Sequence, residues 1–79
     1  MAVTVRFFAA ARSAAGVSEI QVEPGTLTHV QSQLIETYPK LTQVLPQCSF
    51  LLNEVSCSDA LADVPDFSTL DVLPPFAGG

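Results

Sequence analysis

The chain has 79 residues, 48% of them hydrophobic and 14% charged, which fits one small folded domain and argues against a disordered segment. Its formal net charge is −5, and residues 41–79 hold five acidic residues without a single Lys or Arg, which argues against a nucleic-acid partner. No apolar run approaches the roughly 20 residues that cross a membrane, and the first residues lack the order of a signal peptide, so we expect a cytoplasmic protein.

Short strands and helices are predicted to alternate along the chain. Side chains that repeat every second residue, such as Val3, Val5 and Phe7, are typical of a half-buried strand. Gly16 and the Pro24-Gly25 pair are expected to end a short helix and to turn the chain. In chain order we expect a strand at 3–8, a short helix at 9–15, a strand at 17–23, a main helix at 26–38, a helical turn at 41–45 closed by Pro46, and strands at 48–52, 55–57 and 70–73.

The main helix is the longest periodic segment. Thr26 can cap its first turn, and Pro39 ends it because the residue before a proline is pushed out of helical angles. His29 falls on the polar face and is more simply a surface residue than a catalytic base. The apolar stripe is formed by Leu27, Val30, Leu34 and Tyr38, with Ile35 widening it.

The second half of the chain supplies short strands. Asn53-Glu54 between two of them predicts a tight hairpin turn, and residues 58–69 are expected to be mostly irregular. With a first hairpin, a crossing helix and a final central strand, the order predicts an α+β β-grasp fold. Its mixed sheet would have four or five strands, with the one main helix packed on one face.

The side chains offer no catalytic or metal-binding cluster that we can identify. Cys48 and Cys57 are separated by eight residues, which is not the spacing of metal ligands, so two buried free thiols are expected. Arg6 and Arg12 are most simply solvated. The acidic second half has two interpretations, solubility or attraction toward a basic partner.

The last six residues are the strongest candidate for function. Pro74 and Pro75 cannot donate to a sheet, so residues 1–73 are expected to form the domain and residues 74–79 an extended, flexible tail. Such a tail reaches roughly 20 Å. Gly78 and Gly79 carry no side chains and suit a narrow partner site.

The phenylalanines of the chain can belong either to the core or to a surface that contacts a partner. Phe76 is either the last aromatic residue of the core or, as we favour, an anchor that fills a pocket of a partner. The other four phenylalanines cannot all be buried in so small a core, so one or two are expected to face a partner. These four are Phe7, Phe8, Phe50 and Phe67.

The whole chain resembles the ubiquitin-like sulfur carriers, the family that includes MoaD, the small subunit of molybdopterin synthase, and ThiS, the carrier of thiazole synthesis. The resemblance rests on residues 5–12, the capped helix from Thr26, the Leu52-Asn53-Glu54 hairpin and, most specifically, the ending Leu-Asp-Val-Leu-Pro-Pro-Phe-Ala-Gly-Gly at 70–79. Relatives usually have a glycine-containing acidic turn before the last strand. Here residues 66–69, Asp-Phe-Ser-Thr, take that place.

The resemblance implies a function as a sulfur-donating subunit that is not catalytic alone. A MoeB-like adenylyltransferase would use ATP and magnesium, neither bound permanently here, to activate the carboxylate of Gly79, which then becomes a thiocarboxylate. Gly78 and Ala77 would thread into a MoaE-like large subunit, in a heterotetramer that passes sulfur to cyclic pyranopterin monophosphate. Phe76, Pro75 and Pro74 would contact the partner, and no metal is implied.

Three other functions stay open at this stage. The chain could be a sulfur carrier for thiazole or cysteine synthesis, although the ThiS carrier is usually shorter and lacks the Pro-Pro-Phe approach. It could be a ubiquitin-like modifier joined to lysines, because the same activation chemistry serves that role. The least specific alternative is an interaction domain whose Gly-Gly ending is incidental.

Overall fold

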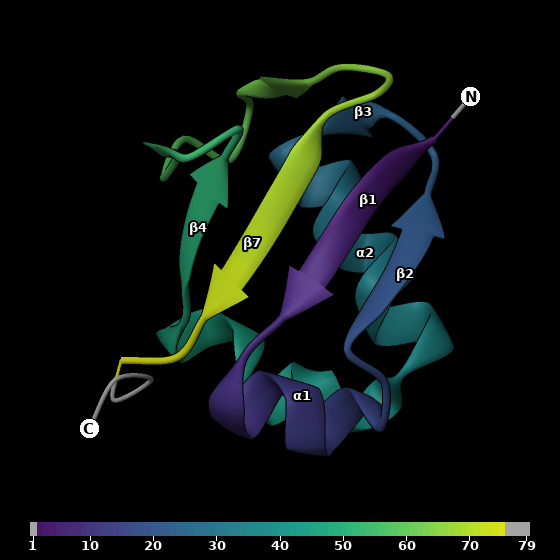
Figure 1. Ribbon diagram of the computed structural model, residues 1–79, viewed down its shortest axis with the longest axis vertical. Coiled ribbons are helices and arrows are strands. Elements are labelled where there is room, and N and C mark those ends of the chain that lie inside the picture. The colour runs from purple at the N-terminus through teal and green to yellow at the C-terminus, as the bar shows by residue number, and fades with distance from the viewer. Residues whose placement is uncertain (1, 76–79) are drawn as a thin grey trace.

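A mixed sheet of five strands forms one layer of the molecule, and the longest helix packs across one of its faces (Figure 1). The structure is a computed structural model that describes residues 2–75. In chain order the elements are β1 (Val3–Phe7), α1 (Ala9–Ala15), β2 (Glu19–Val22), β3 (Gly25–Thr26), α2 (Leu27–Thr37), the 3-10 helices η1 (Pro39–Gln43) and η2 (Leu45–Gln47), β4 (Ser49–Leu52), β5 (Val55–Ser56), β6 (Asp63–Val64) and β7 (Thr69–Leu73).

The last strand occupies the centre of the sheet. The strand order is β2-β1-β7-β4-β5, with β7 parallel to β1 and antiparallel to β4. The first hairpin pairs β1 with β2, and the second pairs β4 with β5. This arrangement confirms the predicted α+β β-grasp fold, with α2 as the main helix on one face of the sheet.

Side chains on the helix-covered face form the core. The alternation predicted for the first strand holds, since its three inward residues are buried, and α2 contributes residues spaced by three and four. The ring of Tyr38 meets that of Phe7 edge to face, with 6.1 Å between centroids. The buried apolar residues are Val3, Val5, Phe7, Ala11, Ala15, Val22, Leu27, Val30, Leu34, Leu41, Leu45, Phe50, Val64, Leu70 and Val72.

Local signals set the helix ends and the hairpin as predicted. Gly16 ends α1 with φ 80° and donates its N–H to the carbonyl of Arg12. The Thr26 hydroxyl caps α2 by accepting the N–H of His29 at 3.1 Å, and His29 itself is exposed. Asn53 and Glu54 both have positive φ, as a two-residue hairpin turn requires.

One expectation about local structure was wrong, and two short strands were not predicted. The helical turn expected at 41–45 is present as two consecutive 3-10 helices, η1 and η2, but Pro46 lies inside the second of them where it was expected to close the segment. The expected turn at Pro24-Gly25 leads into β3, and the segment at 58–69 is mostly irregular as expected but contains β6. These two short strands pair with each other across a large sequence separation, which no local pattern reports.

Candidate functional site

The base of the tail is built where β1 and β7 end. Because the two strands are parallel, the residues that follow them lie at the same end of the sheet, and α1 lies across that end (Figure 1). The N–H of Phe8 still donates to the carbonyl of Val72 at 3.2 Å. Pairing in β7 stops at Leu73, so the chain leaves the sheet beside the start of α1.

A pocket of about 270 Å³ lies at this base. Pro74 is buried and Pro75 is exposed, and both line the pocket. Residues far apart in sequence complete it, from the start of α1 and from the 3-10 helices, namely Ala9, Ala10, Gln43, Val44 and Gln47. The first prolyl residue after the strand is therefore packed against the domain.

Of the residues predicted for the site, the structure describes the two prolines. Phe76, Ala77, Gly78 and Gly79 lie outside the described residues. Sequence reasoning missed the contribution of α1 and the 3-10 helices to the base of the tail. Nothing in the local pattern indicates it, because it follows from the parallel pairing of the first and last strands.

The face of the sheet that α2 leaves uncovered, here called the open face, carries an ion pair at its centre. The register of the parallel pair places Arg6 of β1 beside Asp71 of β7. The Arg6 guanidinium donates two hydrogen bonds to the Asp71 carboxylate, from Nε to Oδ1 at 2.6 Å and from Nη2 to Oδ2 at 2.8 Å. The Arg6 side chain is 45% exposed and that of Asp71 only 9%. The hydrogen bonds and the charge of Asp71 raise the pKa of Arg6.

This pairing corrects the expectation that Arg6 is simply solvated. Its side chain reaches water but is fixed in orientation, whereas Arg12 on α1 is exposed. The sequence contained one signal for it, because an aspartate between two apolar residues of a central strand needs a partner when buried. Which residue would pair with Asp71 depended on a register that joins positions 65 residues apart.

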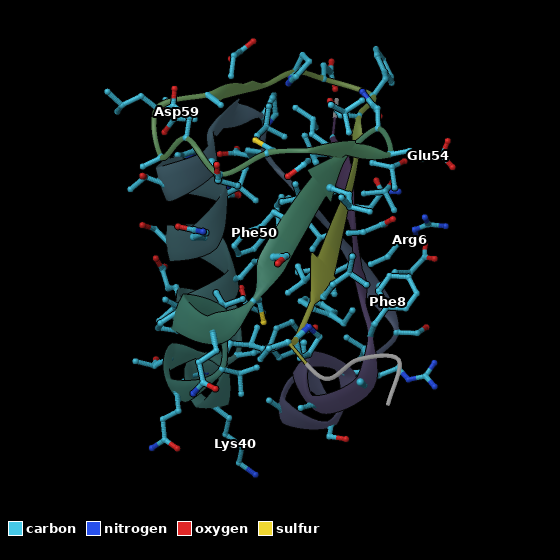
Figure 2. All side chains as sticks on the ribbon, turned by 90° about the vertical axis from the view of Figure 1, so that its left-hand side faces the viewer. Arg6, Phe8, Lys40, Phe50, Glu54 and Asp59 are labelled. Carbon is cyan, nitrogen blue, oxygen red and sulfur yellow. The ribbon has the colours of Figure 1, made fainter. Side chains whose placement is uncertain are left out.

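An aromatic ring and a polar pocket flank the ion pair. The Arg6 guanidinium carbon lies 5.8 Å from the centroid of the Phe8 ring, within cation–π range. Figure 2 shows Arg6, Phe8 and Glu54 on the side of the sheet away from α2. A pocket of about 330 Å³ is lined by Arg6, Asn53, Glu54, Thr69 and Asp71.

The four phenylalanines expected to compete for the core divide as predicted. Phe7 and Phe50 are buried, Phe8 is half-buried, and Phe67 is 84% exposed. That one or two of them face a partner stays a prediction.

The two cysteines line one pocket at the edge between α2 and the β4–β5 hairpin. Both are free and half-buried, so the expectation of buried thiols was too strong. The Cys48 thiol donates to the carbonyl of Val44 at 3.2 Å, and burial raises its pKa.

Within residues 2–75, His, Cys, Asp and Glu side chains nowhere gather in threes as metal ligands would. No helix in this part of the chain combines the length and the hydrophobicity that a membrane span needs.

Comparison with known proteins identifies the family of the chain. The model of the ThiS family matches residues 5–79. The chain belongs to the ThiS family. The molybdopterin synthase sulfur carrier subunit of Chlamydomonas reinhardtii is 34% identical over 84 aligned positions, and the alignment covers 100% of both chains.

Solved structures of similar proteins share the fold of this ThiS-family chain. The small archaeal modifier protein 1 of Methanosarcina acetivorans superposes with a TM-score of 0.85 at 25% identity, covering 99% of this chain and 96% of that one. Subunit 1 in the complex of subunits 1 and 2 of the Helicobacter pylori molybdopterin-converting factor gives 0.76 at 23% identity, covering 100% of both. The likeness at this identity supports the β-grasp fold.

Proposed function

We propose that this chain is the sulfur carrier subunit of a molybdopterin synthase and acts in the cytoplasm. The observation that carries the proposal is the full-length similarity, at 34% identity, to the sulfur carrier subunit of Chlamydomonas. The carrier is not catalytic alone. It donates sulfur from a thiocarboxylate at Gly79 to cyclic pyranopterin monophosphate, and two such transfers build the dithiolene that binds molybdenum.

The chemistry explains why a carrier needs little beyond a fold and a free carboxylate. An unactivated carboxylate is a poor electrophile, so a MoeB-like adenylyltransferase uses ATP and magnesium to convert the Gly79 carboxylate into an acyl-adenylate. A sulfur donor then displaces AMP and leaves a thiocarboxylate. Its sulfur acts as the nucleophile in the active site of a MoaE-like large subunit, and ATP, magnesium and the catalytic side chains all belong to the partners.

The base of the tail supports this role. Pro74 is packed against the domain, so the arm is anchored at the end of the central strand and does not begin in a loose linker. From there to Gly79 an extended chain reaches roughly 20 Å, enough to deliver its end into a partner at high local concentration. Gly78 and Ala77 keep the arm narrow, and Phe76 with the two prolines contacts the partner around its base.

The open face supports a protein partner of the same kind. It is the side of the sheet that α2 leaves free, it carries the half-buried ring of Phe8, and it lies next to the base of the tail through β1 and β7. A large subunit that receives the tail can therefore cover this face in the same complex. We propose a heterotetramer of two large subunits and two carriers.

The test is to reconstitute the pathway with purified components. After incubation with the cognate adenylyltransferase, ATP and a sulfur donor, the intact mass of the carrier should rise by the replacement of one oxygen with sulfur. Addition of the cognate large subunit and precursor should return the mass and form the dithiolene product. A carrier with one alanine appended after Gly79 should stay unmodified, while the same alanine added before Met1 should change nothing. Sulfur transfer from the C-terminally extended carrier would refute the proposal.

A second function deserves a test because the Methanosarcina relative is named a modifier protein. A ubiquitin-like modifier would join its terminal carboxylate to lysine side chains of other proteins. Expression of a tagged carrier in its native cells should then give bands of higher mass on a denaturing blot, and these bands should vanish when Gly79 is deleted. Their absence, with sulfur loading intact, leaves the carrier function alone.

A further inference from the structure

Phe67 combines a backbone conformation and an exposure that are unusual for a phenylalanine. It lies in the turn at 65–68 that leads into β7, and its φ is 67°. This left-handed region is rarely adopted by a bulky side chain, and such outliers gather at functional positions. Phe67 is also 84% exposed.

Backbone contacts, and not the ring, hold this turn in place. The N–H of Phe67 donates to the carbonyl of Ala2 at 2.9 Å and to Oδ1 of Asp66 at 3.1 Å. On the other side, the N–H of Thr4 donates to the carbonyl of Ser68 at 2.9 Å. A glycine at position 67 would keep these hydrogen bonds without the left-handed strain, so the turn does not depend on the ring.

The surroundings of the ring indicate what it meets. The segment between β5 and β7 crosses the end of the sheet opposite the one at which β7 ends (Figure 1), and Figure 2 shows Glu54 and Asp59 at that end, away from Lys40. We call the exposed part of this end the distal rim. It combines apolar and acidic side chains, namely Glu54, Val55, Asp59, Leu61, Asp63 and Phe67.

The negative charge of the distal rim indicates what kind of partner surface can bind there. Every charged residue after Lys40 is acidic, so a second copy of this chain would bring like charges together at the rim. A partner with an apolar pocket bordered by Lys or Arg would instead match both the ring and the acids. Exposed aromatic residues that enter such a pocket often dominate the affinity of an interface.

The distal rim is continuous with the open face. Thr69, two residues after Phe67, lines the polar pocket of that face together with Asn53 and Glu54. Asn53 and Thr69 also exchange hydrogen bonds of 2.8 and 2.9 Å. A partner that covers the open face from the tail therefore reaches the distal rim at its far edge.

The size of the molecule fits such an extended contact. Stable protein interfaces bury about 800 Å² on each partner, which a tail of six residues does not supply. The molecule measures 30 by 24 by 18 Å, and the view down its shortest axis looks onto the sheet (Figure 1), so one whole face is of the required order. An extended path from Phe67 to Pro74, seven residue steps long, spans roughly 23 Å.

We propose that Phe67 is the far anchor of the interface with the large synthase subunit, inserted into an apolar pocket that basic residues border. This inference rests on the proposed function, because it names where the same complex is held at the end opposite the tail. Binding then has two fixed points, the tail in the active site and the ring at the distal rim.

The experiment compares two variants of the carrier that both lack the aromatic ring of Phe67. F67G and F67N both remove the aromatic side chain while suiting a positive φ. V17A is the matched control, because Val17 is an exposed apolar residue outside the distal rim. The dissociation constant of each full-length carrier for the purified cognate large subunit is measured by calorimetry, and sulfur transfer is measured with thiocarboxylated carrier.

Both ringless carriers should bind at least tenfold more weakly, while V17A binds as the wild type does. Their apparent KM for sulfur transfer should rise with kcat unchanged, because the tail still delivers sulfur once bound. F67G should also melt at a higher temperature than the wild type, which separates loss of the ring from misfolding. Salt should slow the association of the wild type.

Two results overturn the inference and leave the proposed function standing. One is an unchanged dissociation constant for F67G and F67N when wild-type carrier transfers sulfur normally. The other is a wild-type dimer in sedimentation that F67G abolishes, which would place a second copy at the distal rim. A wild-type carrier that binds the large subunit without donating sulfur refutes the proposed function, while the comparison of binding still decides the role of Phe67. A wild-type carrier that does not bind the large subunit overturns both.

Discussion

The two faces of the central sheet follow different physical rules. On the covered face, side chains of β1, β7 and α2 are apolar and buried, and their places follow from periodicity. On the open face, the same strands present Arg6 and Asp71, which are held by each other and by their register. Covered-face residues need only be apolar and of the right size, whereas the open-face pair needs one particular alignment of the first and last strands.

The largest expected effect tests the covered face. Leu34 on α2 is fully buried, and L34A should lower the free energy of unfolding by about 2–5 kcal/mol through lost burial and the cavity left behind. The matched control is L61A, in which a largely exposed leucine is cut by the same atoms and stability should change by less than about 0.5 kcal/mol. Urea denaturation followed by circular dichroism measures both. Equal losses in the two variants would contradict the division into covered and exposed positions.

A smaller effect is expected on the open face. R6A leaves the nearly buried carboxylate of Asp71 without its two hydrogen bonds, so stability should fall by less than in L34A but clearly more than in R12A, whose arginine is exposed. R6K should recover only part of the lost stability, because an ammonium group cannot form the bidentate hydrogen bonds of a guanidinium group. Denaturation of R6A, D71A and the double variant isolates the coupling. Additive effects in this cycle would show that the ion pair does not matter to stability.

The smallest effect concerns Cys48, at the edge of the covered face. Burial raises its pKa above the usual thiol range of about 8.5, so the thiol stays protonated at neutral pH. In a C57S background, alkylation of the folded chain should be slow at neutral pH and should accelerate at a higher pH than alkylation of the urea-unfolded chain, in which Cys48 is solvated. A midpoint at the same pH in both states would contradict a raised pKa.

Much of the fold could be predicted from the sequence because the signals for helix ends and turns are local. The Thr26 cap, the glycine that ends α1 and the Asn53-Glu54 turn each depend on neighbours within a few residues, and all three were predicted correctly. The pairing of β3 with β6 was missed since each strand has only two residues and its partner is far along the chain. The candidate site divides in the same way, because the tail was recognised from its sequence and the residues around its base were not.

The sequence by itself determined the covered face, the order of the longer strands and helices, and the Gly-Gly ending, because periodicity, capping and turn chemistry act over short distances. The tertiary structure alone decided that Arg6 pairs with Asp71, that Pro74 packs beside α1, and that the exposed Phe67 lies at the end of the sheet opposite Pro74. Each of these depends on the parallel alignment of the first and last strands. That alignment is fixed by burial of the whole sheet against α2, which no short stretch of sequence encodes.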